Sequence, residues 1–144
     1  LAVSGLGING KMSELQAAMG LAVLPYMETI LAERKRVVDY YNQHLDFLKL
    51  RTIKIREKTI WNYSYYPLVF QNEEQLLRIQ QHLNEDQIFP RRYFYPSLNT
   101  INYSKGQMMP ISESIASRIM CLPLYVGLFE VDLEKIVQLI KKNI

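Results

Sequence analysis

An aromatic stretch at residues 61–70 constrains the fold of this chain more than any other feature. It is aromatic and β-branched in character and contains no glycine, a composition that favours a β-strand. Bulky side chains at successive positions indicate burial on both faces of the strand. Pro67 lacks the N–H that a strand interior needs, so it favours an edge strand or a bulge.

Helical patterns precede and follow this stretch. Ser13 as N-cap and Gln16 in the capping-box position begin a first helix, which Pro25 ends or kinks. The other predicted elements are a helix over 27–48, an exposed strand or loop over 51–58, a helix capped by Asn72, a return to the sheet at 88–89, a short helix over 110–119, a short strand over 120–124 and a helix over 130–142. The predicted inward positions of the later helices are Leu76, Ile79, Leu83, Leu133, Ile136, Val137 and Ile140.

This order of elements predicts an α+β fold, in which a small sheet has helices packed on one face and is preceded by two connecting helices. We expect residues 1–48 to form a glycine loop and helices that connect to a missing large domain. Residues 49–144 then form a small α+β domain. Because the chain begins inside a loop and with Leu1, we interpret it as a piece of a longer protein.

Composition excludes several classes of function. The 144 residues are enough for one core, and 49% apolar with 22% charged residues is ordinary for a soluble globular protein. We expect no apolar run long enough to span a membrane and no signal peptide. Cys121, a single cysteine in an apolar strand, excludes a disulfide framework and is expected to be buried and inert, while His44 and His82 lack a second ligand at metal spacing. The net charge of +3 is too small to require nucleic acid as a partner.

Two groups of residues are candidates for binding. The glycine-rich loop at residues 5–11 carries Asn9 and Lys11 just before a helix, so an amide and an ammonium can reach one phosphate there. The alternative is a flexible, solvated lead-in to an ordinary helix.

The second group combines arginines with aromatic residues over 91–96, and Asn99 follows in a polar loop. Arg92, Tyr93 and Tyr95 are placed to stack on a base and bind its phosphates, as in a site for single-stranded nucleic acid. The alternative is an edge strand with outward arginines and inward aromatics. No catalytic group is evident from the residues alone.

A resemblance adds to this interpretation. Residues 7–21, GINGKMSELQAAMGL, resemble the G-x-N-x-[RK]-M-S-E-x-Q-A-A-x-G-L motif of the DegT/StrS-type nucleotide-sugar aminotransferases. Three later features keep the order of that family: Arg34 with Tyr41 and Leu45 resembles its R-x₆-Y-x₃-L helix, residues 92–96 resemble its R-x-Y-[FY]-x-P stretch, and residues 110–125 resemble its P-x-[AS]-E…LPL segment.

The resemblance implies a PLP enzyme of the aspartate-aminotransferase fold (fold type I), of which this chain is the C-terminal part. Such enzymes move an amino group, usually from glutamate, onto a keto-sugar of a nucleoside diphosphate. The resemblance also implies a cytoplasmic homodimer with shared active sites. It further implies a role in the biosynthesis of deoxyamino sugars, such as those of lipopolysaccharide O-antigen. The version of the 92–96 stretch found here is similar to that of enzymes acting on dTDP-4-keto-6-deoxyhexoses.

The resemblance also implies roles for particular residues. Asn9 matches the asparagine that reaches the PLP phosphate of the neighbouring subunit, and Lys11 stands where many members have Arg. Arg92, Tyr93 and Tyr95 match the loop beside the sugar nucleotide. Asn99 stands where many members have His.

The lysine that binds PLP lies upstream of the glycine loop in this family, so the resemblance implies that the 144-residue chain does not transaminate alone. A non-catalytic module that binds single-stranded nucleic acid or a partner subunit is the alternative.

Overall fold

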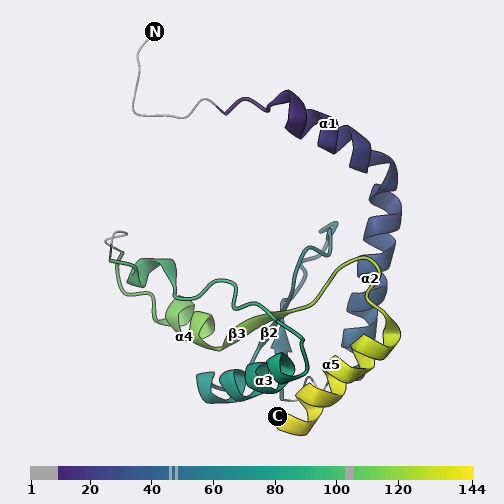
Figure 1. The fold of residues 1–144 in the computed structure, drawn as a ribbon. Helices are drawn as coiled ribbons and strands as arrows, with labels where there is room; N and C mark the ends of the chain where they lie inside the picture. Colours follow the sequence, from purple (N-terminus) through teal and green to yellow (C-terminus); the bar gives the residue numbers. More distant parts are fainter. Residues whose placement is uncertain (1–9, 46, 48, 103–105) are drawn as a thin grey trace, which may run out of the picture.

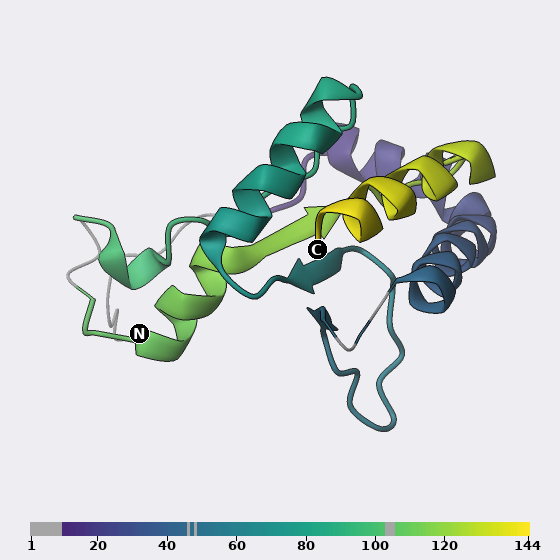
Figure 2. The ribbon, with the colours of Figure 1, turned by 90° about the horizontal axis from the view of Figure 1, so that it is seen from below.

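A computed structural model describes the whole chain apart from residues 1–9, 46, 48 and 103–105 (Figure 1). Its described residues contain three antiparallel strands in the order β1-β2-β3. In chain order the elements are α1 (Glu14–Val23), the 3₁₀ turn η1 (Leu24–Tyr26), α2 (Met27–His44), β1 (Arg51–Thr52), β2 (Tyr66–Val69), α3 (Glu73–Glu85), the 3₁₀ turn η2 (Leu98–Thr100), α4 (Pro110–Arg118), β3 (Ile119–Leu122) and α5 (Glu130–Asn143). Figure 2 shows α3 and α5 side by side over one face of the sheet, and the predicted α+β class is confirmed.

The register between β2 and β3 separates two faces of the sheet. Leu68 lies opposite Met120, and Pro67 lies opposite Cys121. Successive side chains of a strand point to opposite faces. The even-numbered residues of both strands therefore belong to one face, and this face joins the hydrophobic core with α2, α3 and α5. The odd-numbered residues belong to the other face.

The prediction that Pro67 marks an edge strand or a bulge is wrong, because β2 is the central strand. The next even residue after β2, Phe70, donates its N–H on the β3 side, to the carbonyl of Arg118. Because the backbone N–H and C=O groups of successive residues point to opposite neighbouring strands, the nitrogen of Pro67 points toward β1. Since β1 ends at Thr52, opposite Leu68, no ladder bond is lost there. The carbonyl of Pro67 accepts a hydrogen bond from Thr52 Oγ1 at 2.8 Å.

The predicted strand over 61–70 is also shorter than expected, because only Tyr66–Val69 is paired. Tyr63 has a φ of 51°, in the left-handed region, and Ser64 N–H donates to Asn62 Oδ1 at 3.2 Å. This local turn interrupts the extended backbone before β2. The expected return of residues 88–89 to the sheet occurs two residues later, where Arg91 forms an isolated bridge with Cys121.

The helix ends follow the predicted caps closely. Ser13 and Gln16 form the complete capping box of α1. Asn72 caps α3 by accepting the N–H of Gln75, whose side chain binds the N–H of Gln71. The predicted inward residues of α3 and α5 are all buried. α2 ends at His44 rather than at residue 48, because Leu45 adopts an extended conformation there.

Two tyrosines join α2 to the sheet. Tyr41 is fully buried and its hydroxyl donates to the carbonyl of Pro123 at 2.9 Å, while the hydroxyl of Tyr66 donates to Asn42 Oδ1 at 2.7 Å. The two rings lie 4.9 Å apart. The second half of α2 therefore belongs to the same core as the sheet, and the expected division at residues 48 and 49 stays a prediction.

The continuous helical arm formed by α1, η1 and α2 carries exposed apolar side chains in its first half. α1 contains no buried residue, and Figure 1 shows it extending away from the sheet. Within the helix over residues 14–44, an 18-residue window reaches a mean hydropathy of 1.3. By length and composition, this helix is long and apolar enough to cross a membrane. The expectation that no such run exists is therefore wrong by this measure, because the helix continues through the 3₁₀ turn at Pro25. Core helices of soluble proteins and signal sequences meet the same criteria.

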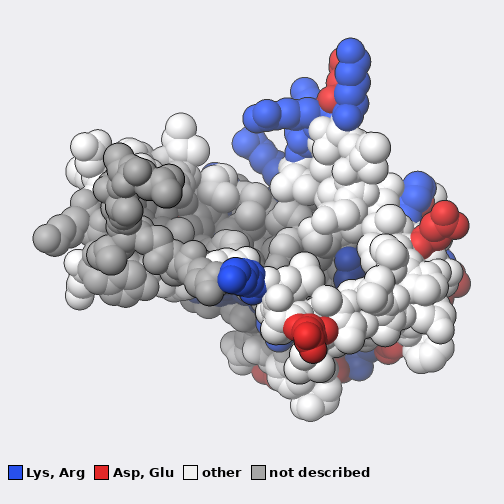
Figure 3. All heavy atoms as spheres, turned by 90° about the horizontal axis from the view of Figure 1, so that it is seen from above, with Lys and Arg blue, Asp and Glu red and all other residues white. Residues whose placement is uncertain are grey.

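Residues 51–58, which comprise β1 and the start of the loop after it, form a positively charged segment. Its basic residues are Arg51, Lys54, Arg56 and Lys58, all of them exposed. Figure 3 shows Lys and Arg side chains gathered on this projection, whereas the rest of the visible described surface mixes both signs of charge. The prediction of an exposed strand or loop over 51–58 is confirmed, with β1 covering its first two residues.

The buried even-numbered face should dominate stability. Leu68→Ala removes a fully buried side chain from the central strand, so we expect the free energy of unfolding to fall by about 2–5 kcal/mol. The matched control is Leu77→Ala on α3, where the side chain is 47% exposed. Urea denaturation of both variants checks the prediction, and equal losses would contradict it.

Candidate functional site

The candidate site lies along β3 and the segment 90–93 beside it. Two cavities border this region, one of about 720 Å³ and one of about 430 Å³, and Tyr93 lines both. Cys121 and Leu122 line the larger cavity, which also reaches Ile136 on α5, and Ile119 lines the smaller. The smaller cavity thus lies on the odd-numbered side of β3, whereas the larger one extends past the end of the strand to the helices.

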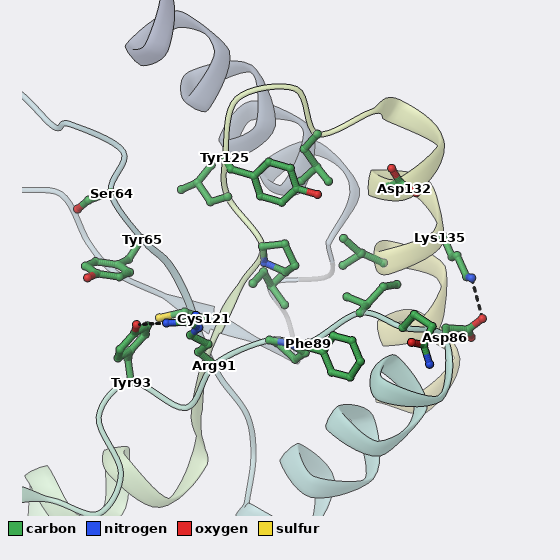
Figure 4. A pocket seen from close by; sticks show the side chains of 18 residues that line it. Ser64, Tyr65, Asp86, Phe89, Arg91, Tyr93, Cys121, Tyr125, Asp132 and Lys135 are labelled. Carbon is green, nitrogen blue, oxygen red and sulfur yellow. Dashed lines mark hydrogen bonds and ion pairs between the residues drawn. The ribbon is translucent and has the colours of Figure 1, made fainter. Parts of the chain in front are cut away.

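Tyr93 is held at one side of the larger cavity. The backbone of Arg91 pairs with that of Cys121 through two hydrogen bonds, of 2.8 and 3.1 Å. From this edge position, Arg91 Nη1 donates to the hydroxyl of Tyr93 at 2.8 Å. The ring of Tyr65 meets that of Tyr93 edge-on at 5.3 Å. Figure 4 shows these three side chains together on one side of the cavity.

The opposite side of the larger cavity is polar as well. Lys135 Nζ on α5 lies 2.7 Å from Asp86 Oδ1, just after α3, and Figure 4 shows this ion pair across the cavity from Tyr93. Sequence reasoning missed both residues, because they are far apart along the chain and each is an ordinary surface charge within its own segment. The apolar wall between the two polar ends includes Phe89 and Pro123.

Arg92 points into the fold, unlike the outward arginine of the simple edge-strand interpretation. Its Nη2 donates to Glu73 Oε1 and to the carbonyl of Ser117, both at 2.7 Å. Its guanidinium carbon also lies 3.7 Å from the centre of the Tyr95 ring. With only 15% of its side chain exposed, Arg92 connects the start of α3 and the end of α4 to the aromatic segment.

The aromatic residues beside Arg92 are turned outward instead. Phe94 is 69% exposed and Tyr95 is 49% exposed. The alternative of outward arginines with inward aromatics is therefore wrong for Arg92, Phe94 and Tyr95, whereas Arg91 is exposed and Tyr93 is half-buried. The segment presents aromatic surface that Arg92 supports from beneath.

Asn99 is also engaged within the fold. Its side-chain amide binds Ser97, Gln107 and Glu113, with distances between 2.6 and 2.9 Å. It lines the smaller cavity together with Tyr93. The structure therefore brings together Arg92, Tyr93, Tyr95 and Asn99, whose predicted contacts with substrate stay predictions.

Of the other predicted pair, Asn9 and Lys11, the structure describes only Lys11. Asn9 lies outside the described residues. Lys11 is exposed just before α1, and no hydrogen bond or ion pair connects it to the residues around Tyr93 in the part of the chain that the structure describes.

The remaining candidates take up structural roles. Cys121 is buried, as predicted, and burial raises the pKa of its thiol from 9.0 to about 11. His44 contacts the carbonyl of Tyr40 at 2.8 Å, and His82 lies 3.3 Å from Glu85 on its own helix. Among the described residues, no group of three or more His, Cys, Asp or Glu side chains is arranged to hold a metal ion.

Comparison with known proteins gives the family. The sequence profile of the DegT/DnrJ/EryC1/StrS aminotransferase family matches residues 1–141. The chain belongs to this family. It is 34% identical over 149 aligned residues to the dTDP-4-amino-4,6-dideoxy-D-glucose transaminase of Escherichia coli, covering 97% of this chain and 40% of that protein. It is 27% identical to the GDP-perosamine synthase of Escherichia coli O157:H7, covering 85% of this chain and 34% of that protein.

Solved structures agree with this assignment. A DegT DnrJ EryC1 StrS aminotransferase from Brucella abortus superposes with a TM-score of 0.80 at 25% identity, covering 95% of this chain and 37% of that one. The aminotransferase TlmJ from Streptoalloteichus hindustanus has the same fold, with a TM-score of 0.82 at 18% identity over 99% of this chain and 39% of that one. The chain thus spans about 40% of the length of the curated relatives it matches.

The internal contacts of Arg92 predict a clear cost for removing it. We expect Arg92→Ala to lower the free energy of unfolding by about 1–3 kcal/mol, because a part-buried ion pair and a hydrogen bond are lost. Arg91→Ala is the control, since its side chain loses only an exposed contact with Tyr93 and should cost less than about 1 kcal/mol. Urea denaturation measures both, and an Arg92 cost no greater than the Arg91 cost would show that the internal contacts contribute little.

The raised pKa of the Cys121 thiol predicts slow alkylation. The thiolate is the reactive form, so a pKa of about 11 leaves Cys121 mostly protonated at pH 8. We expect iodoacetamide to react about 100-fold more slowly than with the same chain in 8 M urea, and the rate to rise steeply between pH 9 and 11. Mass spectrometry of the single cysteine follows the reaction, and rapid labelling of the folded chain at pH 8 would contradict burial.

Proposed function

We propose that this chain is the C-terminal portion of a PLP-dependent aminotransferase that moves an amino group from glutamate to the keto-sugar of a nucleoside diphosphate. The observation that carries the proposal is the family match over residues 1–141. The E. coli relative named dTDP-4-amino-4,6-dideoxy-D-glucose transaminase supports a dTDP-linked 4-keto-6-deoxy sugar as the substrate. The product then belongs to deoxyamino sugar biosynthesis, with lipopolysaccharide O-antigen as its destination.

Asn9 and Lys11 are the proposed contacts to the phosphate of PLP. The exposed ammonium of Lys11 lies two residues before Ser13, the N-cap of α1, where a helix N-terminus favours an anion. This chemistry fits a phosphate. When bound, PLP supplies the electron sink for the reaction. The lysine that anchors PLP is proposed to come from the rest of the protein, and Asn9 to serve the site of the partner subunit in a homodimer.

The aromatic segment is the proposed surface for the nucleotide sugar. Tyr93 and the exposed Tyr95 offer hydroxyl groups and ring faces, which suit a sugar and a base. Arg92 supports this surface from beneath and Asn99 lines the cavity next to it, and both belong to the proposed substrate site. Because the guanidinium of Arg92 is paired with Glu73, the alternative of a site for single-stranded nucleic acid gains no support from this segment.

The apolar side of α1 is proposed to contact protein rather than lipid. The chain is about 40% of the length of its transaminase relatives, so the rest of such an enzyme provides apolar surface to cover Leu15 and Met19. Residues 1–48 would form this connection and residues 49–144 the small C-terminal domain. We place the whole enzyme in the cytoplasm, where nucleotide sugars are made.

A chimera tests the proposal. The C-terminal 40% of the E. coli transaminase is replaced by this chain, and PLP, glutamate and a dTDP-4-keto-6-deoxy sugar are supplied. We expect formation of the amino sugar by the chimera and none by the 144-residue chain alone, because the chain lacks the PLP lysine.

Two variants of the chimera sharpen the result. Asn9→Ala with Lys11→Ala should weaken PLP binding by about tenfold, because two phosphate contacts are removed. Lys142→Ala, at the far end of α5, is the control with equal loss of positive charge. A folded chimera that binds PLP but makes no amino sugar would contradict the proposed function, as would turnover by the chain alone.

A further inference from the structure

A network of hydrogen bonds ties the segments 97–102 and 106–109 to the first turn of α4. Its centre is Asn99, whose amide nitrogen donates to Glu113 Oε1 at 2.6 Å and to the carbonyl of Gln107 at 2.9 Å. Asn99 Oδ1 accepts from Ser97 Oγ at 2.6 Å. Both amide hydrogens of Asn99 are therefore used inside the fold, and only one lone pair of its oxygen is left.

Glu113 is the second centre of this network. Its Oε1 also accepts the backbone N–H of Met109 at 2.8 Å, so one carboxylate oxygen binds both the N-cap residue of α4 and the amide of Asn99. These two hydrogen bonds, that from Met109 first, lower the pKa of the Glu113 carboxyl below its ordinary value. Glu113 therefore stays ionised at neutral pH and binds both donors with charge-assisted hydrogen bonds.

Two further contacts close the arrangement. Ser97 is buried and gives its single hydroxyl proton to Asn99, so Ser112 donates to Ser97 across the 2.9 Å that separates their hydroxyl oxygens. Gly106 packs directly on Asn99, because a Cβ at position 106 would lie 2.6 Å from the Asn99 Cα. The segment 106–109 thus lies against Asn99, with no room for a side chain at position 106.

This network forms one wall of the smaller cavity. Ser97, Asn99, Met109 and Ser112 all line it, and Tyr93 lines it from the opposite segment. Whatever fixes Asn99 therefore also fixes the shape of the cavity beside the aromatic surface.

We propose that Asn99 is a positioning residue, which with Glu113 fastens the segments 97–102 and 106–109 to α4 and so sets the shape of the cavity beside Tyr93, without contacting the substrate itself. The effect on substrate rests on the proposed function. The fastening of the two segments does not.

Isosteric variants test the fastening. Asn99→Asp keeps the shape of the side chain but replaces both donors with a carboxylate that faces Glu113. In the 144-residue chain at pH 7, we expect the Met109 and Thr100 amides to exchange with solvent about tenfold faster, as measured by NMR hydrogen exchange. Asn102→Asp is the matched control, because Asn102 is an exposed neighbour with the same chemistry and should leave these rates unchanged.

A double-mutant cycle makes the test specific. Glu113→Ala removes the oxygen that accepts from both Asn99 and Met109, so it should raise the same exchange rates. Asn99→Asp combined with Glu113→Ala should raise the Thr100 rate no further than either change alone, to within about threefold, because both changes break the same contact. Additive rises, or an equal rise in Asn102→Asp, would overturn the fastening.

The role in substrate binding is read in the transaminase chimera. Asn99→Asp and Glu113→Ala should each raise the KM for the dTDP-sugar by about tenfold while leaving the half-reaction with glutamate unchanged. If Glu113→Ala raises the exchange rates but leaves the KM unchanged while Asn99→Asp raises it, Asn99 contacts the substrate and the positioning role is wrong. An inactive unmodified chimera counts against the proposed function, whereas the exchange rates still decide whether Asn99 fastens the loop.

Discussion

The register between β2 and β3 is the constraint on which the rest of the structure depends. Because Leu68 faces Met120 and Pro67 faces Cys121, one set of side chains enters the core, while Ile119 and Cys121 of the other set border the cavities. A shift of one residue would exchange the two sets and expose the core face to solvent. The burial of the even-numbered residues under α2, α3 and α5 thus selects the register, and this register turns Ile119 and Cys121 toward the candidate site.

Arg92 shows how a charged residue serves such a site without facing solvent. Its ion pair with Glu73 compensates for the burial of the guanidinium, and the bond to the Ser117 carbonyl holds its plane under the ring of Tyr95. The aromatic segment therefore has a rigid base that connects two helices. Exposed aromatic side chains on such a base keep their orientation at low entropic cost, which suits them to binding.

The sequence predicts best what local interactions decide. The capping residues Ser13 and Asn72 act within three positions along the chain, and the inward faces of α3 and α5 follow from helical period alone. The place of Pro67 in the sheet could not be predicted this way, since it depends on where β1 ends, some fifteen residues earlier. The local turn at Tyr63 was missed because aromatic residues surround it, although Asn62 and Ser64 are residue types that favour turns.

In the candidate site, too, residues that are neighbours in sequence could be predicted and partners distant in sequence could not. The motif over 92–96 brings out Arg92, Tyr93 and Tyr95 because they are neighbours in sequence. The partners that orient them could not be identified, because Glu73 and Ser117 come from two different helices. The aspartate and lysine across the larger cavity were missed for the same reason.

The separation of Lys11 from the aromatic surface has a structural consequence. Figure 1 shows α1 extending away from the sheet. The apolar side chains of α1 are exposed, whereas Tyr93 lines the cavities beside β3. A site that uses both Lys11 and Tyr93 therefore needs further protein between them, from the rest of the enzyme or from a second subunit. The apolar surface of α1 provides the driving force for such an assembly, because covering it removes that surface from water. In the proposed enzyme, the burial of α1 and the completion of the cofactor site are thus one event.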